Sequence, residues 1–128
     1  MKCQRYSRAV AAIIITVSAG CGPAIHHAIS TPPESALVYF TNETLDQADV
    51  YAISASQRTR IGTVMAGRTE ALFLPSALIS SSEVRVAARL LARNGLIDTG
   101  PVQFNAGDTY DIRLPSVGNN LLILPARR

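Results

Sequence analysis

The chain has 128 residues, a formal net charge of +3, two cysteines and no tryptophan. This length is enough for one small domain with a single core, and it is too short for two domains. Lys2, Arg5 and Arg8 supply the excess charge, and the rest of the chain holds nine basic and nine acidic residues. No basic field then remains to indicate a nucleic acid or an anionic lipid surface as a partner.

The first 20 residues have the pattern of an export signal. The basic start is followed by an apolar run from Ala9 to Val17 and then by the small residues Ser18, Ala19 and Gly20. A basic segment, a short apolar segment and a small-residue cleavage site define a secretory signal. The apolar run is too short to span a bilayer, which takes about 20 apolar residues. We therefore expect residues 1–20 to be a signal peptide.

The end of this signal, Ala19-Gly20-Cys21, resembles the lipobox of bacterial lipoproteins. The resemblance implies cleavage between Gly20 and Cys21. It also implies a diacylglycerol on the sulfur of Cys21 and a fatty acyl chain, such as palmitate, on its new amino group. Ser18 departs from the family pattern, in which leucine is usual at that position. The resemblance covers only residues 1–21, and the alternative is an ordinary signal peptide in which Cys21 is incidental.

A lipid on Cys21 would make the membrane the first partner of this protein. Each buried methylene contributes about 0.8 kcal/mol and one acyl chain binds only marginally, whereas two or three chains hold a domain firmly. Gly22 follows the cysteine, which resembles the pattern sent to the outer membrane in Gram-negative families. The expected location is therefore the bacterial cell envelope, at the outer membrane rather than the inner membrane.

Residues 21–35 follow as a predicted flexible tether. The segment is rich in glycine, proline and small polar residues, without a sustained hydrophobic period. Fully extended, its residues reach at most about 50 Å. His26 and His27 are a metal pair in principle, but adjacent side chains on a flexible segment make a poor site, so a solvated linker is favoured. Residues 36–128 remain for the folded domain.

This domain contains eight short candidate strands, rich in β-branched and aromatic residues and separated by turn residues. The predicted strands are 36–42, 48–54, 59–65, 68–74, 83–94, 96–104, 109–114 and 120–124. The strand 96–104 is interrupted at Gly100-Pro101, so we expect it to bend or to lie at an edge. Short strands spaced in this way are typical of an antiparallel β-sandwich or a small barrel, and the sandwich is favoured. Residues 75–82 are expected to be a serine-rich loop, and the last strand is expected to be buried on both faces.

The segment from Glu83 to Asn94 is ambiguous between a strand and a helix. As a strand, it directs alternate residues from Val84 onward into the core. As a helix, it places Arg85 and Arg89 on one face with Arg93. A strand is favoured because every neighbouring segment is predicted to be a strand.

The runs VYFTN, ADVYAI, RIGTVMAGRTEALFLP and EVRVAA follow one another in this order. They resemble bacterial exported β-sandwich domains of unknown function. The resemblance covers Val38 to Ala88 and implies an immunoglobulin-like or transthyretin-like sandwich. It carries no catalytic residue over to this chain.

The folded part lacks the residue types that most catalytic chemistry needs. Residues 36–128 contain no cysteine, lysine or histidine, which excludes a catalytic triad, a thiol nucleophile, a histidine-ligated metal and a lysine Schiff base. We expect no enzymatic activity, no cofactor and no metal. The close carboxylate pairs Asp46/Asp49 and Asp108/Asp111 are candidate cation ligands, but a calcium site needs six or more oxygens, so turn and surface roles are favoured.

Tyr39, Tyr51 and Tyr110 are either a ligand-facing stripe or residues that flank the core. The leading hypothesis is a non-enzymatic, membrane-anchored cell-envelope lipoprotein that displays loops or sheet edges to an unknown envelope protein. The alternative is a glycan-binding or small-ligand-binding module that uses a tyrosine-bearing face. No nucleic acid partner is expected.

Overall fold

The structure is a computed structural model that describes residues 34–55, 57–80 and 83–124. The predicted signal peptide, Cys21 and nearly all of the predicted tether lie outside the described residues. The described chain forms eight strands and one short helix. In chain order these are β1 (Ala36–Asn42), β2 (Ala48–Ser54), β3 (Gln57–Val64), β4 (Thr69–Leu74), α1 (Ser76–Ile79), β5 (Val84–Leu90), β6 (Ile97–Asp98), β7 (Thr109–Leu114) and β8 (Leu122–Leu124).

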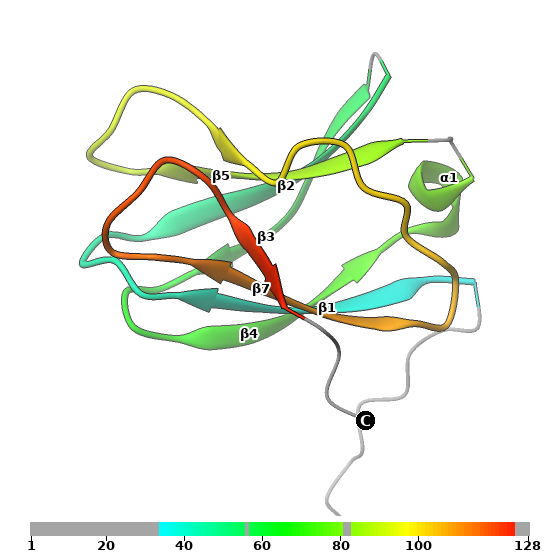
Figure 1. Cartoon of the computed structure of the whole chain (residues 1–128), viewed down its shortest axis with the longest axis horizontal. Helices are drawn as coiled ribbons and strands as arrows, with labels where there is room; N and C mark the ends of the chain where they lie inside the picture. Colours follow the sequence, from blue (N-terminus) through cyan, green and yellow to red (C-terminus); the bar gives the residue numbers. More distant parts are fainter. Residues whose placement is uncertain (1–33, 56, 81–82, 125–128) are drawn as a thin grey trace, which may run out of the picture.

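The strands form two stacked sheets of four strands each (Figure 1). Sheet A has the order β4-β1-β7-β8, and sheet B has the order β3-β2-β5-β6. Neighbouring strands are antiparallel, except that β1 and β7 run parallel. The predicted all-β sandwich is therefore confirmed, with one parallel pair at the centre of sheet A.

The core fills the space between the sheets because successive residues of a strand point to opposite faces. Val38 and Phe40 of β1 are fully buried, and Val50 of β2 and Val86 of β5 meet them from the other sheet within one hydrophobic cluster. The residues between them point outward, as the alternating sequence predicts. The helical alternative for residues 83–94 is wrong, because Val84–Leu90 form β5, which pairs along its whole length with β2. The predicted strand is too long, since residues 91–94 form a turn.

The turn after β3 carries the chain from sheet B to sheet A. Gly67 has a φ of +67°, which favours glycine, and the Arg68 amide donates to the Met65 carbonyl at 3.1 Å. Ala66 and Gly67 form the tight turn itself. It crosses between the layers rather than closing a two-stranded hairpin.

The predicted strand from Leu96 to Phe104 lies at the edge of sheet B and is interrupted at Gly100 as expected, but it is much shorter than predicted. Only Ile97 and Asp98 form β6, and beyond it Val102 makes a single bridge to Val84. Gly100, with a φ of +72°, turns the backbone out of the extended region just before a proline.

Two further predictions at the sheet margins are wrong. The predicted loop of residues 75–82 contains the one-turn helix α1, which buries Leu78 against the core. The last predicted strand is short and lies at the edge of sheet A, where Leu122 and Ile123 are exposed rather than buried on both faces.

Candidate interaction surfaces

Four connections meet at one end of the sandwich, and we call this surface the loop end. The strand registers place them together: Ala48 pairs with Val64 and Leu90, and Asn42 pairs with Leu114. The connections that form the loop end are residues 43–47, 65–68, 91–96 and 115–121. Figure 1 shows them gathered opposite the end that carries α1.

Each of these connections holds an exposed aliphatic or thioether side chain. Leu45 is 97% exposed, Val117 is 86% exposed and Leu91 is 76% exposed, while Met65 and Leu96 are exposed to a smaller degree. Exposed apolar residues scattered singly are normal on a protein surface, but a group of them in one place indicates an interaction site. Of the seven exposed large apolar residues among the described ones, five lie on the loop end.

A buried asparagine fixes the backbone of the loop that carries the most exposed of these side chains. Asn42 is fully buried, and its side-chain Nδ2 donates to the carbonyl oxygens of Asp46 at 2.7 Å and Val64 at 3.1 Å. Its Oδ1 accepts from the Thr44 amide at 3.0 Å and from the Thr44 hydroxyl at 2.7 Å. Both donors and both acceptor positions of the amide are thus used. The loop that presents Leu45 is fixed from within.

Backbone hydrogen bonds tie the other connections to this loop. The Glu43 amide donates to the Leu114 carbonyl, and the Leu91 amide donates to the Gln47 carbonyl. The Asn42 amide donates to the Arg68 carbonyl. All four connections are therefore held relative to one another, so the apolar side chains project from a preorganised surface.

A shallow groove runs between three of the connections at the loop end. One depression of about 270 Å³ lies among Leu45, Arg93 and Pro115, and a second of about 160 Å³ lies beside it along residues 93–97. Leu90 and Ile97 line both depressions. The groove therefore has a mixed lining, with Leu90 and Ile97 at its floor, Arg93 shared by both parts and Asp46 beside the larger one.

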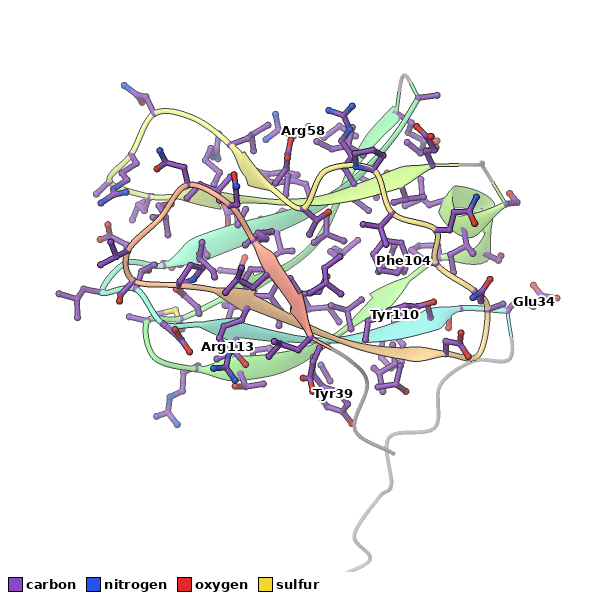
Figure 2. All side chains as sticks on the ribbon, in the orientation of Figure 1. Glu34, Tyr39, Arg58, Phe104, Tyr110 and Arg113 are labelled. Carbon is purple, nitrogen blue, oxygen red and sulfur yellow. The ribbon has the colours of Figure 1, made fainter. Side chains whose placement is uncertain are left out.

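The chain enters the sandwich at the end opposite the loop end. Glu34, the first described residue, lies there beside the start of β1 (Figure 2). The charged residues of the loop end are two acidic residues, Glu43 and Asp46, and two arginines, Arg68 and Arg93. The loop end thus carries no net charge and lies at the end of the sandwich opposite Glu34.

The three tyrosines do not form one stripe, because they lie on three different surfaces. Tyr110 packs edge-on against Phe104 with a ring separation of 4.7 Å, between the layers, and its hydroxyl accepts from the Asn105 amide. Figure 2 shows Tyr39 on the outer side of sheet A, away from this pair. The core-flanking interpretation therefore holds for Tyr110 but not for the other two.

Tyr39 lines a broad depression of about 600 Å³ on the outer face of sheet A. Thr41, Asp111 and Arg113 also line it. The Arg113 guanidinium pairs with Glu43 at 3.2 Å, while its buried Nε makes no hydrogen bond among the described residues. This depression has the polar and aromatic lining of a small-ligand surface.

Tyr51 lies on the outer face of sheet B among four arginines. The Arg58 guanidinium lies 3.9 Å from the centre of its ring, and that of Arg89 lies 5.9 Å away. Arg60 and Arg85 also project from this face. We call this surface the arginine face.

Asp49 organises one side of the arginine face. Its carboxylate pairs with Arg60 at 2.6 Å and with Arg89 at 3.4 Å, and it accepts a hydrogen bond from the Thr63 hydroxyl. Arg60 also donates to the Thr63 hydroxyl. Burial raises the pKa of the Asp49 carboxyl, but the Thr63 hydrogen bond and the two arginines outweigh this effect and leave the pKa below its ordinary value.

The predicted carboxylate pairs do not form cation sites in the described structure. Asp49 is occupied by arginines, and Asp46 contributes its backbone carbonyl to the loop around Asn42. Asp108 accepts from Asn105 and from the Tyr110 hydroxyl, whereas Asp111 points into the depression beside Tyr39. Among the described residues, no three histidine, cysteine or acidic side chains are grouped to hold a metal ion.

The predicted lipidation and cleavage residues, Cys21 and Gly20, lie outside the described residues, as do His26 and His27. Within the part of the chain that the structure describes, no helix has the length and apolar character needed to cross a membrane.

Sequence reasoning missed the loop end and the arginine face. The one signal for the loop end was a large apolar residue inside each otherwise polar connection, such as Leu45 within NETLDQ. That signal becomes visible only when the connections are known to share an end. In comparisons with known proteins, no protein-family model and no curated protein matches the chain.

Proposed function

We propose that this chain is a lipid-anchored protein of the bacterial cell envelope whose sandwich acts as a non-enzymatic docking module. The lipobox-like end of the signal at Cys21 supports the anchor. The loop end supports the docking role. The lipid holds the domain at a membrane, with the outer membrane as the expected one, and the loop end binds an envelope protein.

The observation that carries the docking role is the exposure of Leu45, which is 97% exposed on a loop that the buried Asn42 fixes. An exposed leucine costs nothing in folding, but a rigid loop that presents it reduces the entropy lost when a partner covers it.

The chemistry of the loop end favours a protein over a second membrane contact. Segments that enter a membrane interface combine aromatic residues with an excess of lysine and arginine. The loop end has no aromatic residue and no net charge. Its groove combines Leu90 and Ile97 with the charged side chains Arg93 and Asp46, and such a mixed lining suits an apolar side chain of a partner protein flanked by polar groups.

The anchor is tested by replacing the predicted lipid site. Cys21→Ser should move the protein from the membrane fraction to the soluble fraction and from the detergent phase to the aqueous phase. Cys3→Ser is the matched control, since Cys3 lies within the predicted signal, and it should leave the partition unchanged. Tight membrane retention of the Cys21→Ser protein would refute the lipid anchor.

The docking role is tested separately from the anchor. The double variant Leu45→Ser with Val117→Ser should lose its envelope partner while still folding and fractionating with membranes. Leu122→Ser is the control, because Leu122 is an exposed leucine on strand β8 rather than on the loop end. Partner retention by the double variant would refute docking through the loop end.

The second candidate function is binding of a glycan or small ligand in the depression beside Tyr39. The observation in its favour is the buried, unpartnered Nε of Arg113 at a surface that also offers a tyrosine ring and threonine hydroxyls. Retention of the protein on a glycan column that is lost with Tyr39→Ala, but kept by the loop-end double variant, would favour this function over docking.

A further inference from the structure

The arginine face is a surface distinct from the loop end, and an inference about it goes beyond the proposed docking function. Its residues project from the three longest strands of sheet B, as Figure 2 shows for Arg58 on the side of the sandwich away from Tyr39. No feature of the sequence marks it, because its arginines come from β3 and β5, about 25–30 positions apart in the chain.

Charge is strongly segregated onto this face. The described residues hold seven arginines and nine carboxylates and contain no lysine. The arginine face holds four of those arginines, Arg58, Arg60, Arg85 and Arg89, but only two of the carboxylates, Asp49 and Asp98. The face is therefore net positive, while the remaining described surface is net negative. Such a field attracts a negatively charged ligand to one side of the molecule.

The guanidinium groups are held in place yet remain accessible. Arg60, Arg85 and Arg89 each keep just over half of their side-chain area exposed: 53%, 53% and 51%. The ring of Tyr51 supports Arg58, and Asp49 holds Arg60 and Arg89. A planar guanidinium stacked on a ring keeps its edge free to donate paired hydrogen bonds to a carboxylate or a phosphate.

Two of the four arginines lack a strong carboxylate partner. Among the described residues, Arg58 forms no ion pair, and Arg85 approaches Asp98 only at 4.0 Å. Both residues flank Ile53, from β3 on one side and from β5 on the other. Two strand spacings, about 10 Å, therefore separate their backbones. A ligand that engages both must carry at least two separated negative groups.

The rest of the face argues against a membrane, a protein or a nucleic acid as that ligand. None of the exposed large apolar residues of the described chain lies on it, and its apolar side chains are the half-buried Tyr51 and Ile53. It therefore has little to insert into lipid and only a small apolar centre of the kind that protein interfaces use. Double-stranded DNA carries one negative charge per about 1.7 Å of axis. A face with only four arginines, two carboxylates among them, has too little positive charge to match that density.

We propose that the arginine face binds an anionic polysaccharide. Acid groups on separate sugar units would be held by Arg58 and Arg85, which flank Ile53. Hydroxyl groups of sugar units further along the face would meet the carboxylates of Asp98 and Asp49 and the hydroxyl of Thr63. Carboxylates placed among arginines are then useful, because they accept hydrogen bonds from uncharged sugar hydroxyls.

The test measures binding of the full chain, purified in detergent, to polygalacturonate, an acidic polysaccharide, and to dextran, a neutral one. We expect retention on polygalacturonate that weakens with salt, and none on dextran. The double variant Arg58→Gln with Arg85→Gln should weaken polygalacturonate binding about tenfold or more. Arg68→Gln is the matched control, because Arg68 is an exposed arginine of the loop end, and it should bind like the native protein.

Three outcomes would overturn this inference. The first is unchanged binding by the double variant when circular dichroism shows that it is folded. The second is equal retention on dextran. The third is tighter binding to anionic phospholipid vesicles or to double-stranded DNA than to polygalacturonate, under the same salt. Binding by the Leu45→Ser and Val117→Ser protein should be unaffected, so a failure of the docking function leaves this test intact.

Discussion

At the scale of single residues, Asn42 connects the fold to the candidate interaction surface. It is the one fully buried asparagine among the described residues, and it joins β1 of sheet A to the last carbonyl of β3 in sheet B. A buried amide of this kind is costly unless every polar atom is satisfied. Here each of its polar atoms has a partner, and the result is a fixed loop with Leu45 at its tip.

Asn42→Ala should therefore lower the free energy of unfolding by about 2–3 kcal/mol, because it leaves buried backbone groups without partners. Urea denaturation followed by circular dichroism measures this change. Asn105→Ala, at an exposed turn, should change the stability by less than about 0.5 kcal/mol. If the two substitutions had equal effects, Asn42 would not organise the loop.

Asp49 makes the stability of the folded domain depend on pH in the acid range. Its pKa lies below the ordinary value of 3.8 in the folded state, so the unfolded chain binds this proton more readily. The stabilisation is fully present above the unfolded pKa and is lost as pH falls through the folded pKa. The window of loss therefore begins near pH 4 and extends below it.

Asp49→Asn should remove that part of the acid sensitivity. The stability difference between the native protein and the variant should be constant above about pH 5 and should shrink as the pH falls below about 4. Chemical denaturation across this range measures it, and Arg60→Gln should reduce the same dependence in part. A difference that grew towards low pH would have the wrong sign for this explanation.

At the scale of elements, alternation of apolar and polar residues decided which predictions held. β1, β2 and β7 have the predicted bounds, since each packs one face on the core and its sequence alternates accordingly. The strand predicted over 96–104 has the expected interruption at Gly100 and the expected edge position, but it is only two residues long, because the residues beyond Gly100 make a single bridge. The predicted burial of β8 on both faces was wrong for another reason: an apolar run in the sequence does not distinguish an edge strand from a central one.

The turn after β2 stores strain that one substitution should release. Ala55 has a φ of +41°, a conformation that costs a residue with a Cβ about 1–2 kcal/mol. Ala55→Gly should raise the stability by up to about 1 kcal/mol, since the added freedom of the unfolded chain offsets part of the gain. Thermal unfolding measures it.

Ala66→Gly is the matched control for this prediction, because Ala66 lies in the turn after β3 without a positive φ. It should lower the stability slightly, through the greater flexibility of the unfolded chain. A loss of stability with Ala55→Gly as well would show that Ala55 is not strained in the folded protein.

At the scale of the whole molecule, the candidate surfaces are products of topology. The loop end consists of connections that are separated along the chain. They meet because the β1–β2, β3–β4, β5–β6 and β7–β8 connections all lie at the same end of this sandwich. The arginine face likewise gathers residues from β3 and β5 on either side of β2. The sequence predicted the layers and the core, but it did not predict these groupings, which depend on strand order.

The same topology places the start of the described chain and the loop end at opposite ends of the sandwich. The chain enters at Glu34, at one end, and the loop end lies at the other (Figures 1 and 2). A lipid on Cys21 and a tether leading to Glu34 would leave the loop end free to meet a partner. The anchor, the tether and the docking surface would then act in series.

The most direct test of this account is photocrosslinking in living cells from a reactive amino acid placed at position 45. Position 77 is the control, because Ala77 is exposed on α1 at the opposite end. The account predicts one dominant crosslinked envelope protein from position 45, lost when Val117→Ser and Leu91→Ser are added, and none from position 77. The same adducts from both positions, or none from position 45 in membrane-bound protein, would contradict it.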